Sequence, residues 1–576
     1  MDENESSVKI LDYTIKLLVR PISMSYVGTV FYTINKVPSN HQLVLKCDKS
    51  IQINTVRQKG VDLKYMYNVV KHTLHIACIN ESPSFPYAIS FIGSLEHYKE
   101  GFSYIDDSTA VIQLFPNFGS LFIPCQNTFD ISNISANITV EEDGQSAICS
   151  IPCSHIQPLV RNQRSFVFPK SELPFSFFSL VVGVYEKFEG TSNKGTKLII
   201  YLDHTILSDE ENQTLNDLGN NYLSLFSILL NEIEEKLNLV PHFNTIQIAN
   251  ISTVIASENN TTGLLLFTNS ILKNHKNRKL YISKQIIKQY FPFYPKSINE
   301  FWIIEGISTF LALRLFFTPE EALEIYQNQF FIKILNSDTD KSIRALGDPI
   351  YIDINSDDDN EEIFDDIYCL KSVCFIYQLL SNKTLVEISF YLQKLINFGK
   401  ILTYESFLKA FECQKYDCFV KNSGYPIILL NDDLTLKQIR FTPSKNTKNI
   451  VYSLPLNITY IKNTEKFQQT LIFQEEEIKL NQELNDSDYI LINPCCESLC
   501  RVWYRGKWLG KIITNLFDIP KQTQVNIKCD MTALGDMGLV NKKKIEDLDI
   551  IHTNVNRRRF PLVRGNGSLI STFQES

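Results

Sequence analysis

The apolar residues of this chain change their spacing near residue 205. Before that point, short runs rich in Val, Ile, Phe and Tyr are separated by turn-forming clusters such as KVPSNHQ and NESPSFP. This pattern is typical of strands and predicts an all-β segment from about 10 to 195. After it, SDEENQTLNDLGNNYLSLFSILLNEIEEKLNLV supplies Ser208 as a helix cap, an acidic first turn and apolar residues at helical spacing. The two patterns in succession predict a multidomain α+β fold.

The rest of the chain extends this division. Helical spacing recurs and predicts helices at 280–291, 300–316, 319–335, 365–381, 383–397 and 404–412. After SGYPIILL, at 423–430, short strand-like runs return until about 530 and predict a small C-terminal β-sandwich. Clusters of Lys and Arg near the end, NKKK and NRRR, predict a basic tail. The predicted domains are therefore an all-β domain at 1–195, an α/β domain at 196–441, a β-sandwich at 442–535 and a tail at 536–576.

Composition excludes several classes of function. The formal net charge of -8 at pH 7 argues against bulk electrostatic binding to nucleic acid, because such binding needs clustered positive charge. The amino-terminal MDENESSVKI has no positively charged region followed by an apolar run, and the longest apolar stretch, FSFFSLVVGVY, is too short to cross a bilayer. We therefore expect no membrane partner, nucleic acid at most as an indirect partner, and a cytoplasmic protein, with the nucleus as the alternative.

One predicted helix carries an unusual pair of charges. In YISKQIIKQYF, at 281–291, apolar residues at helical spacing predict a partly buried helix. Lys284 and Lys288 are four residues apart and so lie on the same face of that helix, where two like charges are unfavourable by roughly 0.2–0.5 kcal/mol. Further along comes Glu305, within the strongly apolar FWIIEGISTFLAL.

The order of these and other segments resembles that of the aminopeptidase N family of gluzincin zinc aminopeptidases. KQIIKQYF stands where the family has its His-Glu-x-x-His helix, and FWIIEGISTF is similar to its Leu-Trp-x-Asn-Glu-Gly-Phe-Ala-Thr-Tyr helix. IYCLKSVCFIYQLL is similar to the helix that carries the family's catalytic tyrosine. NSGYPIILLNDDLTLKQIRF and ILINPCCESLCRVWY resemble strands of the third domain, and LFPNFGSLFIPCQNTFDI resembles a strand of the first. The resemblance covers about residues 10–510 in the family's order.

The resemblance implies a fold and an activity. It implies a saddle-like N-terminal β-sandwich, a thermolysin-like α/β peptidase domain at 196–441 and a small C-terminal β-sandwich. Members of the family remove N-terminal residues from peptides with a zinc-activated water. Tyr368 corresponds to their transition-state tyrosine. Glu258 and Asn259 are the candidates for binding the free amine of a peptide, and an alignment on Gly263 puts Asn260 there instead.

The residues that would hold and use zinc are replaced. The family's two histidine ligands and glutamate base correspond to positions in Lys284-Gln285-Ile286-Ile287-Lys288, and its third ligand corresponds to Glu305. A lysine ammonium has no lone pair for a dication, and Gln285 cannot accept a proton from water. We therefore expect neither zinc nor another cofactor. We hypothesise that Glu305 lies between the two ammonium groups, so that a salt bridge joins the two helices in place of zinc.

These expectations point to binding rather than catalysis. The sequence predicts a catalytically inactive aminopeptidase N-like protein that acts as a binding or scaffold subunit, with peptides as a second candidate ligand. The family's helical fourth domain has no counterpart in this sequence, so we expect a protein partner or a second copy to cover the face left exposed. One alternative is a transcription scaffold resembling the aminopeptidase-derived subunit of TFIID, which has likewise lost its zinc ligands. The other is a residual zinc aminopeptidase with a moved metal site.

Overall fold

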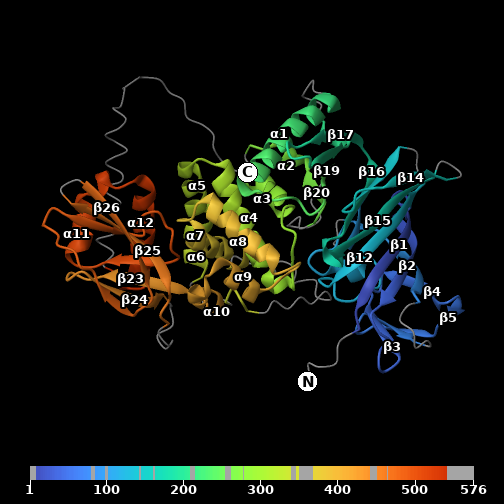
Figure 1. Ribbon diagram of the computed structural model, residues 1–576, viewed down its shortest axis with the longest axis horizontal. Coiled ribbons are helices and arrows are strands. Elements are labelled where there is room, and N and C mark those ends of the chain that lie inside the picture. Colours follow the sequence, from blue (N-terminus) through green and yellow to red (C-terminus); the bar gives the residue numbers. More distant parts are fainter. Residues whose placement is uncertain are drawn as a thin grey trace, which may run out of the picture. The chain divides into compact units, whose positions relative to one another are not determined.

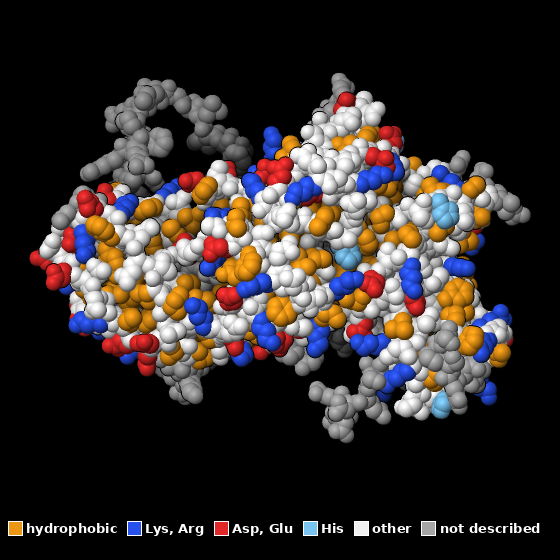
Figure 2. All heavy atoms as spheres, in the orientation of Figure 1, with side chains coloured by type: hydrophobic (Ala, Val, Ile, Leu, Met, Phe, Trp, Pro, Cys, Tyr) orange, Lys and Arg blue, Asp and Glu red, His pale blue; other side chains and the backbone are white. Residues whose placement is uncertain are grey.

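The computed structural model describes residues 8–78, 85–97, 101–141, 144–159, 163–207, 214–252, 261–276, 278–338, 345–348, 367–441, 450–462 and 465–540. These residues form both sheets and helices, so the predicted α+β class is confirmed (Figure 1). The chain divides into two compact units, residues 1–322 with 346–417 and residues 323–345 with 418–576. None of the described helices is long and apolar enough to span a membrane. On the face shown in Figure 2, acidic and basic side chains are interspersed.

The N-terminal part of the first unit is built on an eight-stranded sheet. Its strands, in spatial order, are β14 (His155–Pro158), β15 (Arg164–Pro174), β12 (Ile131–Val140), β1 (Ile10–Arg20), β2 (Ser25–Ile34), β8 (Tyr87–Ser94), β4 (Ile51–Gln58) and β5 (Val61–Asp62). β1 and β12 are parallel, and the other neighbours are antiparallel. Along β12, ISNISANITV alternates between half-buried and buried residues, because successive side chains of a strand point to opposite faces. One face of the sheet is therefore packed, and the other is open.

Two smaller sheets complete this β-rich region. One contains β13 (Gln145–Cys149), β16 (Ser179–Val184), β11 (Thr109–Gln113), β10 (Gly101–Asp106) and β9 (Glu96–His97), and the other contains β3 (Gln42–Lys46), β7 (Thr73–Ala77) and β6 (Tyr65–Asn68). Aromatic rings fill the interior, among them Tyr13, which stacks on Phe175 with 4.9 Å between ring centroids. Apart from two short 3-10 turns, the regular structure described between 10 and 195 consists of strands. The predicted strand-rich character of this segment is confirmed.

A mostly parallel sheet follows. Its order is β17 (Glu186–Thr191), β18 (Lys197–Leu202), β19 (Thr245–Ile251) and β20 (Leu264–Thr268). β18, β19 and β20 run parallel to one another. β19 and β20 are buried almost throughout, as expected of parallel strands that are covered on both faces. The long helix α1 (Leu215–Leu237) lies against β17 and β18.

The start of α1 differs from the prediction. Thr214 caps the helix: its hydroxyl accepts a hydrogen bond from the Asp217 backbone N–H at 3.2 Å, and the Asp217 carboxylate accepts one from the Thr214 N–H at 3.3 Å. Two backbone donors at the helix end are thereby satisfied reciprocally. The predicted cap, Ser208, lies outside the described residues, and the cap of α1 is Thr214 instead.

The helices after β20 include those that the apolar spacing predicts. They are α2 (Asn269–Lys273), which the spacing did not predict, α3 (Lys279–Lys288), α4 (Phe301–Phe316), α7 (Ser372–Leu380), α8 (Leu385–Asn397) and α9 (Tyr404–Phe411), with a short parallel pairing of β21 (Tyr294–Pro295) and β22 (Ile401–Leu402). α4 packs against α3 and α7 and is buried along nearly its whole length. A Cβ on Gly306 would lie 2.6 Å from Ile376 and 2.8 Å from the Ser372 carbonyl oxygen. This glycine therefore allows the close approach of α4 and α7.

The second unit combines two sheets with helices. One sheet has the order β27 (Glu477–Lys479), β24 (Thr435–Phe441), β23 (Tyr425–Leu430) and β29 (Arg501–Tyr504), and the other has the order β26 (Glu465–Phe473), β25 (Leu454–Lys462) and β28 (Tyr489–Ile492). The helices of this unit are α6 (Ile332–Ser337), α10 (Cys418–Lys421), α11 (Lys507–Thr514), α12 (Lys521–Asp536) and the end of α5 (Pro319–Tyr326). The Arg501 guanidinium donates to Asp530 of α12 at 3.2 Å and to the Leu335 carbonyl oxygen of α6 at 2.7 Å. This buried arginine joins the two helices to β29.

The prediction of strand-like structure as far as about residue 530 is wrong from residue 507 onward. α11 buries Trp508 and Ile512, and α12 buries Ile527 and Met531. Residues four apart share a face of a helix, whereas a strand brings residues two apart to one face. α12 also buries polar residues, including Asp530, so its apolar residues alone give a weak periodic signal. Of the predicted basic tail, residues beyond 540 lie outside the described residues.

Candidate functional site

α3 and α4 bring three of the predicted site residues together. α3 buries the apolar face that contains Ile282 and Ile286, and its packing on α4 fixes where its charged side chains reach. Figure 1 labels α3 and α4. Lys284 and Lys288, one turn apart on α3, both form salt bridges with Glu305 of α4. The hypothesis of a salt bridge between these two helices is confirmed.

The two ammonium groups bind different oxygens of one carboxylate. Lys284 Nζ donates to Glu305 Oε2 at 2.9 Å, and Lys288 Nζ donates to Glu305 Oε1. The side chains are largely removed from solvent, with exposed fractions of 13% for Lys284, 7% for Lys288 and 7% for Glu305. We call Lys284, Lys288 and Glu305 the triad. Its net charge is +1 when all three groups are ionised.

The surroundings of the triad favour the ionised carboxylate. Burial raises the pKa of Glu305, but the two ammonium groups outweigh burial and lower this pKa to about 2. The Phe301 ring faces Lys288, with 5.2 Å between Nζ and the ring centroid, and the Tyr281 ring faces Lys284 at 5.7 Å. The negative faces of these rings stabilise the two ammonium groups.

The triad does not fit a divalent cation. Both oxygens of Glu305 already accept hydrogen bonds from ammonium groups. Neither lysine offers a lone pair, and two ammonium groups would repel a dication. Gln285, which lies between the two lysines in the sequence, is fully buried. Its neutral amide cannot act as a general base. Elsewhere among the described residues, no three His, Cys, Asp or Glu side chains cluster in a way that could hold a metal ion.

The end of α3 is tied to the segment that leads into β20. The Gln289 side chain donates to the Thr261 carbonyl oxygen at 2.9 Å and accepts from the Gly263 backbone N–H at 2.7 Å. Gly263 has a φ of +83°, and a Cβ there would lie 2.1 Å from a backbone oxygen, so the position requires glycine. The peptide-amine candidates Glu258 and Asn259, together with the alternative at 260, lie outside the described residues.

Tyr368 is a fully buried residue beside the triad. It lies in a turn of π-helix at 367–371, directly before α7. Its hydroxyl donates to the Ile298 carbonyl oxygen at 3.1 Å, and its ring is nearly parallel to that of Phe301, with 6.5 Å between centroids. Phe301 also faces Lys288. Tyr368 therefore adjoins the triad through a shared aromatic neighbour, and its hydroxyl is bonded to the backbone.

The structure contains a second buried carboxylate that the sequence analysis did not predict. Glu234 of α1 is 1% exposed. It accepts hydrogen bonds from the Tyr290 hydroxyl at 2.9 Å and from Ser192 Oγ at 2.7 Å. Burial and then the Glu234 charge raise the pKa of Tyr290, so its hydroxyl stays protonated and donates. The partners are 56 and 42 residues from Glu234 along the chain, and no local pattern reveals such a pairing.

Compared by sequence, the chain matches no protein-family model and no curated protein. The resemblance to the aminopeptidase N family therefore stays a prediction that rests on the motifs and their order. Of the residues that this resemblance singles out, Lys284 and Lys288 both contact Glu305, and Tyr368 stacks on Phe301, whose ring faces Lys288.

Proposed function

We propose that this protein is a catalytically inactive relative of aminopeptidase N that acts by binding, as a scaffold subunit or as a peptide-binding protein. The observation that carries the proposal is the triad, in which the one acid retained from the family's metal site is held between two ammonium groups. In this proposal residues 1–195 form the saddle-like β domain, and the remainder of the first unit, which ends at residue 417 and not at the predicted 441, forms the thermolysin-like domain. The β-sandwich corresponds to the two sheets of the second unit, which also contains α11 and α12.

The proposal explains why both histidines would be exchanged for lysine. A buried carboxylate that loses its counter-charge is strongly destabilising, by about 3–5 kcal/mol when one partner of a buried pair is removed. Two lysines at the positions of the two ligands supply one donor for each oxygen of Glu305. The triad would thus keep α3 and α4 joined without a metal ion, and the framework would survive the loss of the chemistry.

Hydrolysis of a peptide bond would need a base that the triad does not supply. A general base is most effective when its pKa lies near the working pH, whereas the pKa of Glu305 is about 2. Gln285 offers only an amide. The two ammonium groups are already engaged by the carboxylate. These features support binding without turnover.

Exposed apolar side chains on α8 support a protein partner. Val386 and Phe390 lie one turn apart on this helix and are 80% and 57% exposed. Neighbouring apolar residues on an exposed helix face are typical of surfaces that bind other proteins. We propose a partner protein or a second copy of this chain as the main ligand, and peptides as the second candidate.

Restoring the metal ligands tests the proposal. In the variant K284H/Q285E/K288H, Glu305 would complete a set of two imidazoles and one carboxylate on adjacent helices, the arrangement that binds zinc. We expect this variant to retain about one zinc ion per chain after dialysis, as measured by metal analysis. The matched control carries the same three substitutions with E305A and should lose the ion. A variant that binds no zinc, or equal zinc in the control, would contradict the proposed ancestry of the site.

The wild-type protein supplies the remaining tests. We expect no hydrolysis of an aminoacyl fluorogenic substrate, and activity that a chelator abolishes would establish the residual-peptidase alternative instead. Proteins that co-purify with the wild type from its own cells identify the partner. Co-purification with TFIID subunits would favour the transcription scaffold.

A further inference from the structure

A hollow of about 550 Å³ lies on the open face of the eight-stranded sheet. The strand register places Asn137, Lys16, Thr29 and Ser90 in one row across β12, β1, β2 and β8. Because neighbouring strands are about 4.8 Å apart, this row is roughly 14 Å long. The hollow therefore extends along this polar row across four strands and is not a narrow pit.

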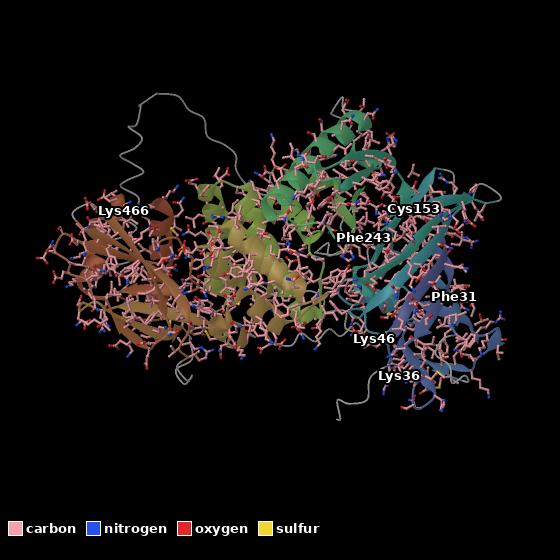
Figure 3. The ribbon with its side chains drawn as sticks, viewed as in Figure 1. Phe31, Lys36, Lys46, Cys153, Phe243 and Lys466 are labelled. Carbon is pink, nitrogen blue, oxygen red and sulfur yellow. The ribbon has the colours of Figure 1, made fainter. Side chains whose placement is uncertain are left out.

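The charge of the hollow favours an anion. Among the described residues, Lys16 is the one charged side chain that lines the hollow, and no described carboxylate lines it. Lys16 is exposed and forms no ion pair with the described residues, and its Nζ lies 5.3 Å from the centroid of the Phe31 ring. Figure 3 labels Phe31 on the eight-stranded sheet. By contrast, Lys170 of the same sheet is paired with Asp12. A cation without a counter-charge, in a hollow without acids, attracts a negatively charged group.

The other polar side chains favour a ligand rich in hydroxyl groups. Thr29 and Ser90 bond to each other at 2.9 Å. The remaining uncharged polar residues that line the hollow are Asn54, Asn137, Thr139 and Ser165. Their side chains form no hydrogen bond with any described residue. Amides and hydroxyls offer donors and acceptors together, which matches the mixed hydrogen bonding of sugar hydroxyls. The Phe31 ring supplies an apolar surface for one face of a sugar ring.

We propose that this hollow binds an acidic saccharide. The sugar carboxylate lies at Lys16, its hydroxyls bond the unpartnered amides and hydroxyls, and one ring rests on Phe31. An acidic peptide fits less well. β1, β2, β8 and β12 are interior strands whose backbone groups already pair with one another, so the sheet offers an extended peptide no backbone partners. This site is independent of the triad and of the function proposed for it.

The test compares an acidic with a neutral disaccharide on the full chain. Digalacturonic acid and galactobiose differ in their carboxylates, and isothermal titration calorimetry measures both. We expect digalacturonic acid to bind with a Kd of about 1 mM and galactobiose to bind about tenfold more weakly. K16M should weaken the binding of digalacturonic acid about tenfold, and F31A should weaken both sugars. K170M, the matched control, should leave both Kd values unchanged.

Any one of three results would contradict the proposed site. The first is the absence of measurable heat from digalacturonic acid at tens of millimolar. The others are equal Kd values for the acidic and neutral sugars and an unchanged Kd for digalacturonic acid in K16M. Tighter binding of tetraglutamate than of digalacturonic acid would replace the saccharide with an acidic peptide. Lys16 is exposed, so thermal unfolding of K16M at the wild-type temperature verifies that the variant is folded.

Discussion

Glu305 stays ionised in a buried place because each of its two oxygens bonds an ammonium group. Removing such ions from water costs several kcal/mol for each one, and only close, fully bonded geometry offsets that cost. The rings of Tyr281 and Phe301 add attraction for the two cations. The triad is therefore sensitive to the loss of one member but much less so to the loss of all three.

Substitution of Glu305 alone is predicted to lower the stability of the protein strongly. E305Q removes the carboxylate charge to which both largely buried ammonium groups are bonded, and we expect it to lower the free energy of unfolding by about 3–5 kcal/mol. Urea denaturation of the full chain measures this change. E324Q, at an exposed position of α5, is the control and should change the free energy by less than about 0.5 kcal/mol.

The joint replacement K284M/E305L/K288M separates charge from packing. It removes all three charges and keeps the volume apolar, so we expect stability within about 1 kcal/mol of the wild type, or above it. A loss as large as that of E305Q would mean that the destabilisation comes from packing and not from uncompensated charge.

The pKa of Glu305 predicts a dependence of stability on pH. It is about 2 in the folded chain and about 4.3 in an unfolded chain, so the folded state holds fewer protons between these values. The resulting stabilisation, about 3 kcal/mol, is complete above about pH 5 and is lost as the pH falls towards 2. Unfolding free energies measured across this range should fall more steeply for the wild type than for E305Q. Parallel curves would show that Glu305 is not the group responsible.

At the scale of helices and strands, the sequence predicted most of what lies around the site. The helices α3, α8 and α9 have apolar residues at helical spacing, and α4 is a long apolar run, so their positions could be predicted. The convergence of Lys284 and Glu305 followed from a resemblance in motif order. The bonds from Tyr290 to Glu234 and from Arg501 to Asp530 could not be predicted, because each joins distant parts of the chain. α12 was missed because several of its buried residues are polar.

The close contact between α4 and α7 predicts that a Gly→Ala substitution at Gly306 lowers stability, whereas the same substitution at Gly510, which has no such contact, raises it. In G306A the new methyl group would meet Ile376 at 2.6 Å and a backbone oxygen at 2.8 Å. We expect a loss of about 1–3 kcal/mol, which exceeds the gain of about 1 kcal/mol from helix propensity. In G510A of α11 nothing lies within 4 Å of the new group, so only the gain remains. Urea unfolding of both variants should therefore show changes of opposite sign, and a stabilising G306A would contradict the close approach.

At the scale of the whole molecule, each of the two units has its own buried ion pairs. The triad lies in the first unit, and Arg501 with Asp530 lies in the second. Residues 323–345 belong to the second unit although they sit in the middle of the predicted α/β domain. Their helical pattern does not differ from that of their neighbours, so only contacts such as Arg501 to Leu335 reveal where they belong.

Because each unit has its own buried ion pairs, we expect that a substitution in one unit lowers the stability of that unit alone. R501M leaves Asp530, which is 1% exposed, without its counter-charge, so we expect the second unit to lose about 3–5 kcal/mol. Native-state hydrogen exchange, followed by mass spectrometry of peptides, measures the opening free energy of each unit. In R501M, protection should fall in β23, β29 and α12 and stay unchanged in α4 and β19, and E305Q should give the reverse. Equal losses in both units for either variant would mean that the chain opens as one cooperative body.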